Sequence, residues 1–456
     1  MNLPKKWKGL SQVWTTYWFR PAPLFNLAVC RIFIVAFQLF YLINNNYISK
    51  LFDLSALPNS QYKPLPILQL LVSPLGWNYN PPFAFLAIVF WLTLVVGLLA
   101  LIGLKTNLSL IFFAVGNIFM QAYIYSFGDY HHPEALMIIT LSLLALSPAG
   151  KVLSIDDLRH RIQQNIKRRR FEVFNIMTKK SVFARWSLLL VQWMFALIYL
   201  SAALSKLGKP GPGLFTLDWM NGYTLQYYLL RDGLRWGSDL GIWLGQHHTL
   251  AWIASCTAIL FEGTFFLVLI FPGLIWLYIP MGAALHTGIY LTQRAPFFQY
   301  IAIYAVFIPW TSVIKTLSRR QRFARTKNKP ELLYDGLCPL CIRSMTVLCY
   351  FDWVNCITYS DLEKRWLSVS EIHPEISLEA CREEMHLLLP NGSVRKGFFA
   401  FREILRYLPP LWPLLVVCHF PAASTIGPKI YKFVASRRPQ FDRCSYGTCS
   451  INFDDK

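Results

Sequence analysis

Long apolar stretches are the feature that most constrains this chain. A helix needs about 20 mostly apolar residues to cross the roughly 30 Å hydrocarbon core of a membrane. Eight stretches approach that length, at residues 24–43, 83–104, 107–126, 133–149, 184–204, 249–271, 273–292 and 295–314. Only 15% of all residues are charged, against about 25% in soluble proteins. The sequence therefore predicts a mainly α protein built on a polytopic transmembrane helix bundle of about eight spans.

Basic residues indicate how the bundle is oriented. The formal net charge is +20, and the basic runs 151–185 and 315–329 lie directly beside apolar stretches. Lys and Arg at such places set orientation and bind anionic headgroups, so the charge favours the lipid bilayer as a partner and argues against nucleic acid. We expect loop 150–183 to lie on the inner membrane surface and both termini to be cytoplasmic. The first stretch is too long for a cleavable leader, and we expect it to remain as a helix.

After Pro330 the pattern changes to that of a small α/β domain. We predict strands at 331–334 and 355–359, a helix from Cys338 to about Tyr350, a hairpin of 385–389 and 393–396, and a helix at 398–407. Asn391-Gly392 is a favoured hairpin turn. The predicted domains are a transmembrane bundle at 1–318, a basic juxtamembrane linker at 319–330, an α/β domain at 331–440 and a cysteine-containing tail at 441–456.

The motif Cys338-Pro339-Leu340-Cys341 directly follows a predicted strand and opens a helix. The helix dipole and the unpaired amides at a helix N-terminus stabilise a thiolate. Pro339 suits the first turn because no N–H donor is needed there. The spacing lets Cys341 resolve a mixed disulfide formed at Cys338. We therefore predict Cys338 and Cys341 as catalytic residues of thiol–disulfide exchange.

Two other interpretations of this cysteine pair stay open. The pair is half of a structural zinc site if further ligands come from Cys418, His419, Cys444 and Cys449. It is otherwise an inert pair of thiols. A standing structural disulfide is not expected in a cytoplasmic domain, where a reducible pair that cycles fits better. We assign no metal ligands.

The stretch Tyr334-Asp335-Gly336-Leu337-Cys338-Pro339-Leu340-Cys341 closely resembles the start of the DCC family of thiol-disulfide oxidoreductases. Lys396-Gly397-Phe398-Phe399-Ala400-Phe401 and the run toward Arg437-Arg438 are also similar to that family. The resemblance covers about residues 331–440. It implies a thioredoxin-like fold and protein-disulfide reductase chemistry, with a thiol reductant and a protein disulfide as partners. Glu383-Glu384-Met385 stands where thioredoxins carry a cis-proline.

A few ionisable residues fall within or beside the apolar stretches of the bundle, and such residues mark a function or a buried pair. We expect Lys206, His131, His132, Glu262 and His286 to approach one outward-facing pocket, beside Trp219 in the aromatic-rich loop 205–248. A desolvated lysine can act as a base, and a histidine can donate to a developing oxyanion. The alternatives are a snorkelling lysine, interfacial histidines, a helix–helix hydrogen bond at His286 and a structural role for Glu262.

Four stretches of the membrane part resemble the HTTM family, the bacterial relatives of vitamin K-dependent gamma-glutamyl carboxylase, over about residues 20–315. They are Ala28-Val29-Cys30-Arg31-Ile32, His131-His132 with Leu153-Ser154-Ile155-Asp156, Leu204-Ser205-Lys206-Leu207 with Asp218-Trp219-Met220-Asn221-Gly222-Tyr223, and His286. The resemblance implies that Lys206 is a base toward a reduced quinone and that His132 stabilises its anion. His131, His286, Glu262 and Trp219 would then bind the quinone, and the location would be a bacterial inner (plasma) membrane. The carboxylase has asparagine in place of His131 and a large extracytoplasmic domain in place of the cysteine domain.

Three hypotheses follow from these features. The first is a membrane-anchored thiol-disulfide oxidoreductase whose membrane pocket binds a quinone-like, lipid-soluble ligand. The second is a vitamin K carboxylase-like or epoxidase-like membrane enzyme, which requires hydroquinone-dependent chemistry at Lys206. The third is a non-enzymatic scaffold or transporter whose second domain binds a partner, in which case both motif cysteines can be changed to serine without effect.

Overall fold

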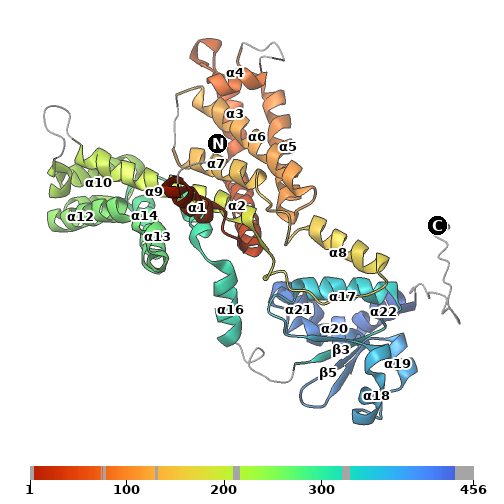
Figure 1. Ribbon diagram of the computed structural model, residues 1–456. Coiled ribbons are helices and arrows are strands. Elements are labelled where there is room, and N and C mark those ends of the chain that lie inside the picture. The colour runs from red at the N-terminus through yellow and green to blue at the C-terminus, as the bar shows by residue number, and fades with distance from the viewer. Residues whose placement is uncertain are drawn as a thin grey trace. The chain divides into compact units, whose positions relative to one another are not determined.

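The chain divides into two compact units, and each is described by itself. The computed structural model describes residues 5–72, 74, 79–128, 132–208, 216–320 and 329–436. The first unit comprises Met1–Ser154 and Lys180–Trp310, and the second comprises Ile155–Lys179 and Thr311–Lys456 (Figure 1). The second unit is therefore discontinuous in sequence.

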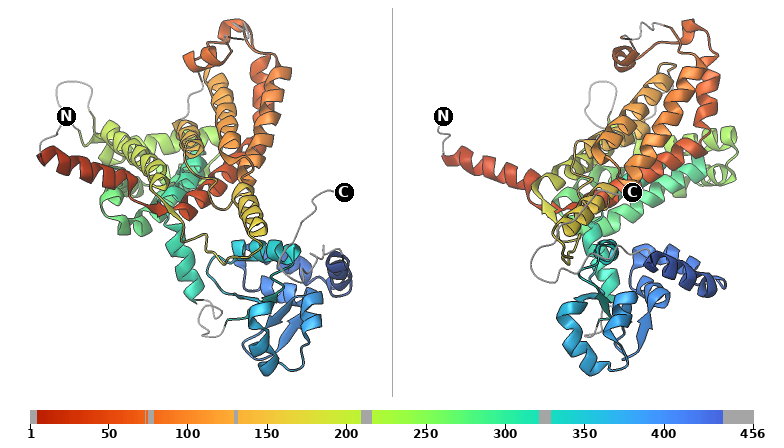
Figure 2. Two further views of the ribbon diagram at one scale, coloured as in Figure 1. Left: turned by 45° about the vertical axis from the view of Figure 1, so that its right-hand side comes forward. Right: turned by 90° about the vertical axis from the view of Figure 1, so that its right-hand side faces the viewer.

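The first unit is a bundle of apolar helices, shown in two further views in Figure 2. Six helical segments of the described chain are long and apolar enough to cross a membrane, which confirms the predicted transmembrane bundle. They are α2 (Leu24–Asn44), α5 (Phe83–Ile102), α6 (Thr106–Tyr125), α9 (Trp186–Leu207) with its preceding turn η3 (Val182–Ala184), α12 (His248–Thr264) with α13 (Leu267–Ile270), and η5 (Pro272–Leu274) with α14 (Ile275–Gln293).

Shorter elements complete the first unit. The first of them, in chain order, are α1 (Lys5–Phe19), β1 (Ala22–Pro23), α3 (Tyr47–Ser55), η1 (Asn59–Gln61), α4 (Pro66–Val72), α7 (His132–Ala145) and β2 (Lys180–Ser181). The later ones are η4 (Asp218–Asn221), α10 (Tyr223–Trp236), α11 (Asp239–Gly245), α15 (Phe298–Ile303) and η6 (Tyr304–Phe307). The outer loop expected at 205–248 is thus largely helical.

Two predicted spans differ from full-length helices. Helix α7 has 14 residues, about 21 Å at 1.5 Å per residue, which is short of the hydrocarbon thickness. The segment expected at 295–314 is bent by 76° between η6 and α16 (Trp310–Arg320). Pro309 explains the break, because the residue before a proline is driven out of the helical region, and Ile308 is extended at φ −78° and ψ 124°. The described chain has up to eight spans if each bent helix pair is counted as one.

The second unit contains a four-stranded sheet in the order β4-β3-β5-β6. Its strands are β3 (Glu331–Tyr334), β4 (Thr358–Asp361), β5 (His386–Leu388) and β6 (Val394–Lys396). Strands β3 and β4 are parallel with Glu331 opposite Thr358, whereas β5 is antiparallel to both β3 and β6. One strand–helix–strand unit followed by a hairpin confirms the predicted thioredoxin-like arrangement.

Helices cover both faces of this sheet, because successive strand residues point to opposite sides. Leu332 and Leu387 join the core under α17 (Pro339–Phe351) and α20 (Gly397–Leu405), whereas Leu333 and Leu388 join the core under α18 (Leu362–Ile372) and α19 (Leu378–Glu383) (Figure 1). The unit ends with η8 (Pro409–Leu411), α21 (Trp412–Cys418) and α22 (Ala423–Ser436).

Strand β4 begins three residues later than predicted, and Asp352 explains the shift. Its carboxylate accepts hydrogen bonds from the backbone N–H groups of Cys356 at 2.7 Å and Ile357 at 3.1 Å. These bonds hold residues 352–357 in a turn, so the strand starts only at Thr358.

Residues 155–179, which lie between two membrane helices in the sequence, pack inside the second unit. Helix α8 (Ile155–Lys167) places Asn165 so that its Nδ2 donates to Oγ1 of Thr346 at 3.0 Å. Phe171 is buried in the sheet core, with its ring centroid 5.5 Å from that of Tyr334. Ile166, Phe171 and Phe174 of this segment pack into or against the sheet core. The predicted position of loop 150–183 on the inner membrane surface stays a prediction.

Candidate functional site

The Cys-x-x-Cys motif lies at the junction of β3 and α17. Cys338 is the N-cap residue of α17, and its Sγ accepts a hydrogen bond from the backbone N–H of Cys341 at 3.4 Å. Pro339 occupies the first turn, which contains no acidic residue. The turn before the helix is fixed by Asp335, whose Oδ1 accepts from the N–H of Leu337 at 2.9 Å. The Cys338 sulfur therefore sits where helix amides favour a thiolate.

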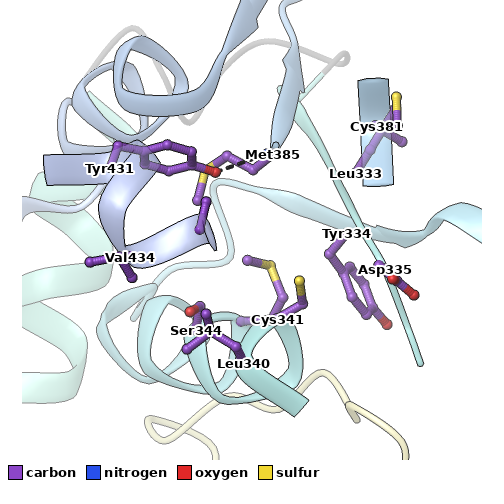
Figure 3. Close-up of a pocket in the computed structure, with 12 residues that line it drawn as sticks. Leu333, Tyr334, Asp335, Leu340, Cys341, Ser344, Cys381, Met385, Tyr431 and Val434 are labelled. Carbon is purple, nitrogen blue, oxygen red and sulfur yellow. Dashed lines mark hydrogen bonds between the residues drawn. The ribbon is translucent and has the colours of Figure 1, made fainter. Parts of the chain in front are cut away.

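A cavity of about 70 Å³ opens beside Cys341, and we call it the motif cavity. Four parts of the second unit line it: the β3–α17 segment, helix α19, the approach to β5, and helix α22 (Figure 3). Its lining residues include Tyr334, Cys341, Ser344, Met385, Tyr431 and Val434. The Tyr431 hydroxyl accepts a hydrogen bond from the backbone N–H of Met385 at 3.0 Å, which fixes α22 to the strand that faces the motif.

Met385 belongs to the stretch that stands where thioredoxins carry a cis-proline. The described residues contain no cis peptide bond. The side chain of Met385 lines the motif cavity, and its backbone N–H is already engaged by Tyr431. Neither Met385 nor Tyr431 was selected from the sequence, since 46 residues separate them and no motif links them.

Position 336 requires glycine because the carboxylate of Asp361 lies too close for a side chain. A Cβ atom at this position would lie 2.6 Å from Oδ1 of Asp361. Burial raises the pKa of the neighbouring Tyr334 hydroxyl to about 12, and Asp361 adds to that rise while Arg170 opposes it. The motif therefore has an acidic neighbour on β4 that the spacing of its residues did not indicate.

Burial makes the other four thiols in the described part of the second unit poor nucleophiles. Burial raises the pKa of Cys349 to about 12 and the pKa values of Cys356 and Cys381 to about 11. Burial also raises the pKa of Cys418. Since the thiolate is the nucleophile, burial disfavours exchange at these four cysteines. Cys349, Cys356 and Cys381 are buried, whereas Cys418 is only partly buried.

The zinc interpretation depended partly on residues beyond the described chain. Cys444 and Cys449 lie outside the described residues, as does the whole predicted tail at 441–456. Among the residues that the structure describes, no group of three or more His, Cys, Asp or Glu side chains is arranged to hold a metal ion.

In the first unit, three of the predicted residues come together. The Lys206 ammonium at the end of α9 lies 2.5 Å from Oε2 of Glu262 on α12. It also lies over the Trp219 ring, 5.4 Å from the centroid. An ion pair within an apolar bundle is a costly arrangement that either fixes helix packing or serves a ligand.

His286 belongs to a neighbouring aromatic cluster. Its Nε2 lies 2.6 Å from the hydroxyl of Tyr199 on α9, and that hydroxyl also contacts the hydroxyl of Tyr304. The His286 ring also contacts Tyr300 and Phe297. His131 lies outside the described residues, and the side chain of His132 is likewise outside them. The convergence predicted for the two histidines therefore stays a prediction.

An apolar cavity of about 430 Å³ lies between α11, α12 and α14, and we call it the bundle cavity. Its walls are mostly aliphatic, with residues Leu244, Leu250, Ile253, Ala254, Thr257, Ala258, Phe261, Met281, Ala284 and Leu285. Phe261 and Leu285 are the chain neighbours of Glu262 and His286. The cavity thus lies on the same two helices as those polar residues.

Comparison with known proteins bears on the second unit. No curated protein and no solved structure matches the chain. The resemblance of residues 20–315 to the HTTM family stays a prediction. Residues 332–444, which contain the motif, the sheet and the helix that walls the motif cavity, match the family model of the DCC1-like thiol-disulfide oxidoreductases.

Proposed function

We propose that the protein is a membrane-anchored thiol-disulfide oxidoreductase of the protein-disulfide reductase type. The observation that carries the proposal is the position of the Cys338 sulfur, which caps α17 beside a cavity lined by Cys341. The family match over residues 332–444 supports the same chemistry. The apolar helices of the first unit supply the anchor.

The reaction transfers two electrons through the two thiols. The Cys338 thiolate attacks one sulfur of a substrate disulfide, forms a mixed disulfide and releases the other substrate sulfur as a thiolate, which takes a proton from water. Cys341 then loses its proton and attacks the Cys338 sulfur. This step releases the second substrate thiol and leaves a Cys338–Cys341 disulfide. A dithiol reductant restores both thiols and is itself oxidised to a disulfide.

The roles of the two cysteines are tested by trapping in the full-length protein held in lipid nanodiscs. Cys341→Ser removes the resolving thiol, so a mixed disulfide at Cys338 should accumulate with a disulfide-containing peptide. Cys338→Ser should accumulate none. The matched control is Cys381→Ser, because Cys381 lines the same cavity but has a raised pKa. Equal trapping in all three variants would refute the assignment.

The full chain is needed for this experiment. A fragment that begins near residue 328 lacks residues 155–179, whose Phe171 and Asn165 pack into the second unit. Titration of the full-length protein against glutathione buffers should give a reversible two-electron transition. The scaffold hypothesis requires instead that both serine variants behave as the wild type.

We also propose that the bundle cavity binds a lipid-soluble, quinone-like ligand. Support comes from its apolar walls, from Glu262 and His286 on the lining helices α12 and α14, and from Lys206 on α9, which pairs with Glu262. His132 and His131 would assist as the resemblance implies. Quinone binding should quench tryptophan fluorescence, and the quench should weaken in Trp219→Phe and in Lys206→Met. Hydroquinone-dependent turnover that requires Lys206 would favour the carboxylase-like alternative.

The proposed location is a bacterial inner membrane with both termini in the cytoplasm. The distribution of basic loops supports this orientation. An impermeant thiol reagent should therefore label the motif cysteines only in opened vesicles. Labelling of these cysteines from the outside of intact cells would show that the orientation is the opposite of the proposed one.

A further inference from the structure

Helices α21 and α22 present an apolar face that the described part of the second unit does not bury. The side chain of Val416 is 76% exposed, and that of Ile430 is 58% exposed. The whole set, which we call the hairpin face, consists of Trp412, Leu414, Val416, Val417, Phe420, Ile426, Ile430 and Phe433. Soluble surfaces rarely gather so many large apolar side chains, and such patches mark sites of protein or membrane contact.

The helical positions show that this face is separate from the domain core. On α22, Gly427 and Tyr431 point inward, and a Cβ atom at Gly427 would meet the Phe398 ring at 2.4 Å. Ile426, Ile430 and Phe433 follow an i, i+4, i+7 pattern and lie on a different side. Helix α22 therefore packs one face against the domain and leaves a second, apolar face exposed.

Basic side chains border the hairpin face. Residues 409–436 contain no Asp or Glu. Lys429 and Lys432 lie beside the apolar stripe of α22 and are exposed. Arg402 on α20 donates to the Ser424 hydroxyl at 3.2 Å, and Arg406, directly after α20, lies 3.4 Å from Nε2 of His419. An apolar face with a positive border is complementary to an anionic bilayer surface, where the rings and chains enter the acyl boundary and the cations meet the headgroups.

The dimensions favour lying in the bilayer surface over crossing it. The arms Pro409–Cys418 and Ala423–Ser436 together are apolar enough for a span, but they are bent by 110°. At 1.5 Å per residue the arms are about 15 and 21 Å long, and neither reaches across about 30 Å of hydrocarbon. The apolar spans of the first unit hold the same chain at a bilayer, so this surface is always within reach of the hairpin.

We propose that the α21–α22 hairpin embeds its apolar face in the surface of an anionic bilayer. Helix α22 also supplies Tyr431 and Val434 to the motif cavity. Docking therefore holds that cavity at headgroup level. It follows, if the proposed oxidoreductase function is correct, that the substrate is a disulfide presented at the membrane surface, such as one in the juxtamembrane segment of a membrane-bound protein.

Photo-cross-linking of the full-length protein tests the docking without reference to activity. A benzophenone amino acid is placed at Val416 or Ile430. The protein is held in nanodiscs of phosphatidylcholine, either alone or with about 30 mol% of the anionic lipid phosphatidylglycerol. We expect lipid adducts at both positions, at least threefold more with the anionic lipid. The control is Leu367 on α18, which is 81% exposed and should give none. Adducts to the first unit, or to a second copy of the chain, would overturn the proposal.

A second measurement tests the consequence for substrate choice. The double variant Val416→Asp/Ile430→Asp places charges on exposed positions outside the motif cavity. Reduction of a disulfide peptide carrying a lipid anchor should fall at least tenfold, while reduction of the soluble peptide should stay unchanged. Leu367→Asp should alter neither rate. Equal effects of the double variant on both peptides would refute the proposal that the substrate disulfide is presented at the membrane surface. If the wild type reduced neither peptide, the oxidoreductase function would be refuted, while the cross-linking result would still stand.

Discussion

Phe171→Ala tests whether the segment between two membrane helices is part of the second unit. Phe171 is 5% exposed, and its ring lies 5.5 Å from the rings of both Tyr334 and Tyr359. Truncating a buried phenylalanine to alanine costs about 3 to 5 kcal/mol. Since every 1.4 kcal/mol is a factor of ten, the open form of the unit should become roughly 100-fold to 4,000-fold more populated.

Alkylation of Cys349 provides the assay. This thiol is buried in the same core, and burial raises its pKa to about 12, so it reacts only when the core opens. Its rate of maleimide labelling, resolved by mass spectrometry, should rise by the same factor in Phe171→Ala. The matched control is Val173→Ala, because Val173 belongs to the same segment but is 59% exposed. Equal labelling in the two variants would refute the assignment of residues 155–179 to this core.

Two further predictions concern buried ionisable groups. Burial raises the pKa of Asp352 from 3.8 to about 6, so the folded unit holds this proton more tightly than the unfolded chain. The protonated carboxyl therefore adds about 3 kcal/mol to the free energy of unfolding. This stabilisation is full below about pH 4 and is lost as the pH rises to about 6. Thermal unfolding across that range should show this loss in the wild type and not in Asp352→Asn, and equal slopes would contradict it. Lys206→Met or Glu262→Leu alone should cost about 3 to 5 kcal/mol of bundle stability in nanodiscs, because each leaves one unpaired charge. The double variant should recover most of that loss, whereas additive losses would show that the two side chains are not coupled.

Local signals carried much of the prediction for the second unit. Cys338 and Pro339 mark the start of α17, and the N-cap geometry agrees with that placement. Asn391-Gly392 marks the hairpin, where Gly392 adopts φ +81° and the N–H of Leu389 donates to the carbonyl of Ser393. These features depend on a few neighbouring residues, which is why the sequence reveals them.

Features that depend on distant partners were not predictable in the same way. Asn165 and Thr346 are 181 residues apart, and an amphipathic basic helix has the same pattern whether it lies on a membrane or against a protein core. Tyr431 reaches the motif cavity only through the packing of α22. Lys206 and Glu262 were both selected as ionisable residues, but their pairing depends on how α9 and α12 are rotated, which hydropathy does not determine.

The discontinuous second unit restricts how the chain can be threaded through a bilayer. Residues 155–179 and 331–408 share one core, so both must lie on the same side of the membrane. The number of crossings between residue 179 and residue 331 is therefore even. Three long apolar helical segments lie in that interval, at Val182–Leu207, His248–Ile270 and Pro272–Gln293. Either one of these three segments does not cross, or the bent pair Phe298–Phe307 and Trp310–Ser318 adds a fourth crossing. Both arms of that pair would then be required, because Phe298–Phe307 alone is about 15 Å long.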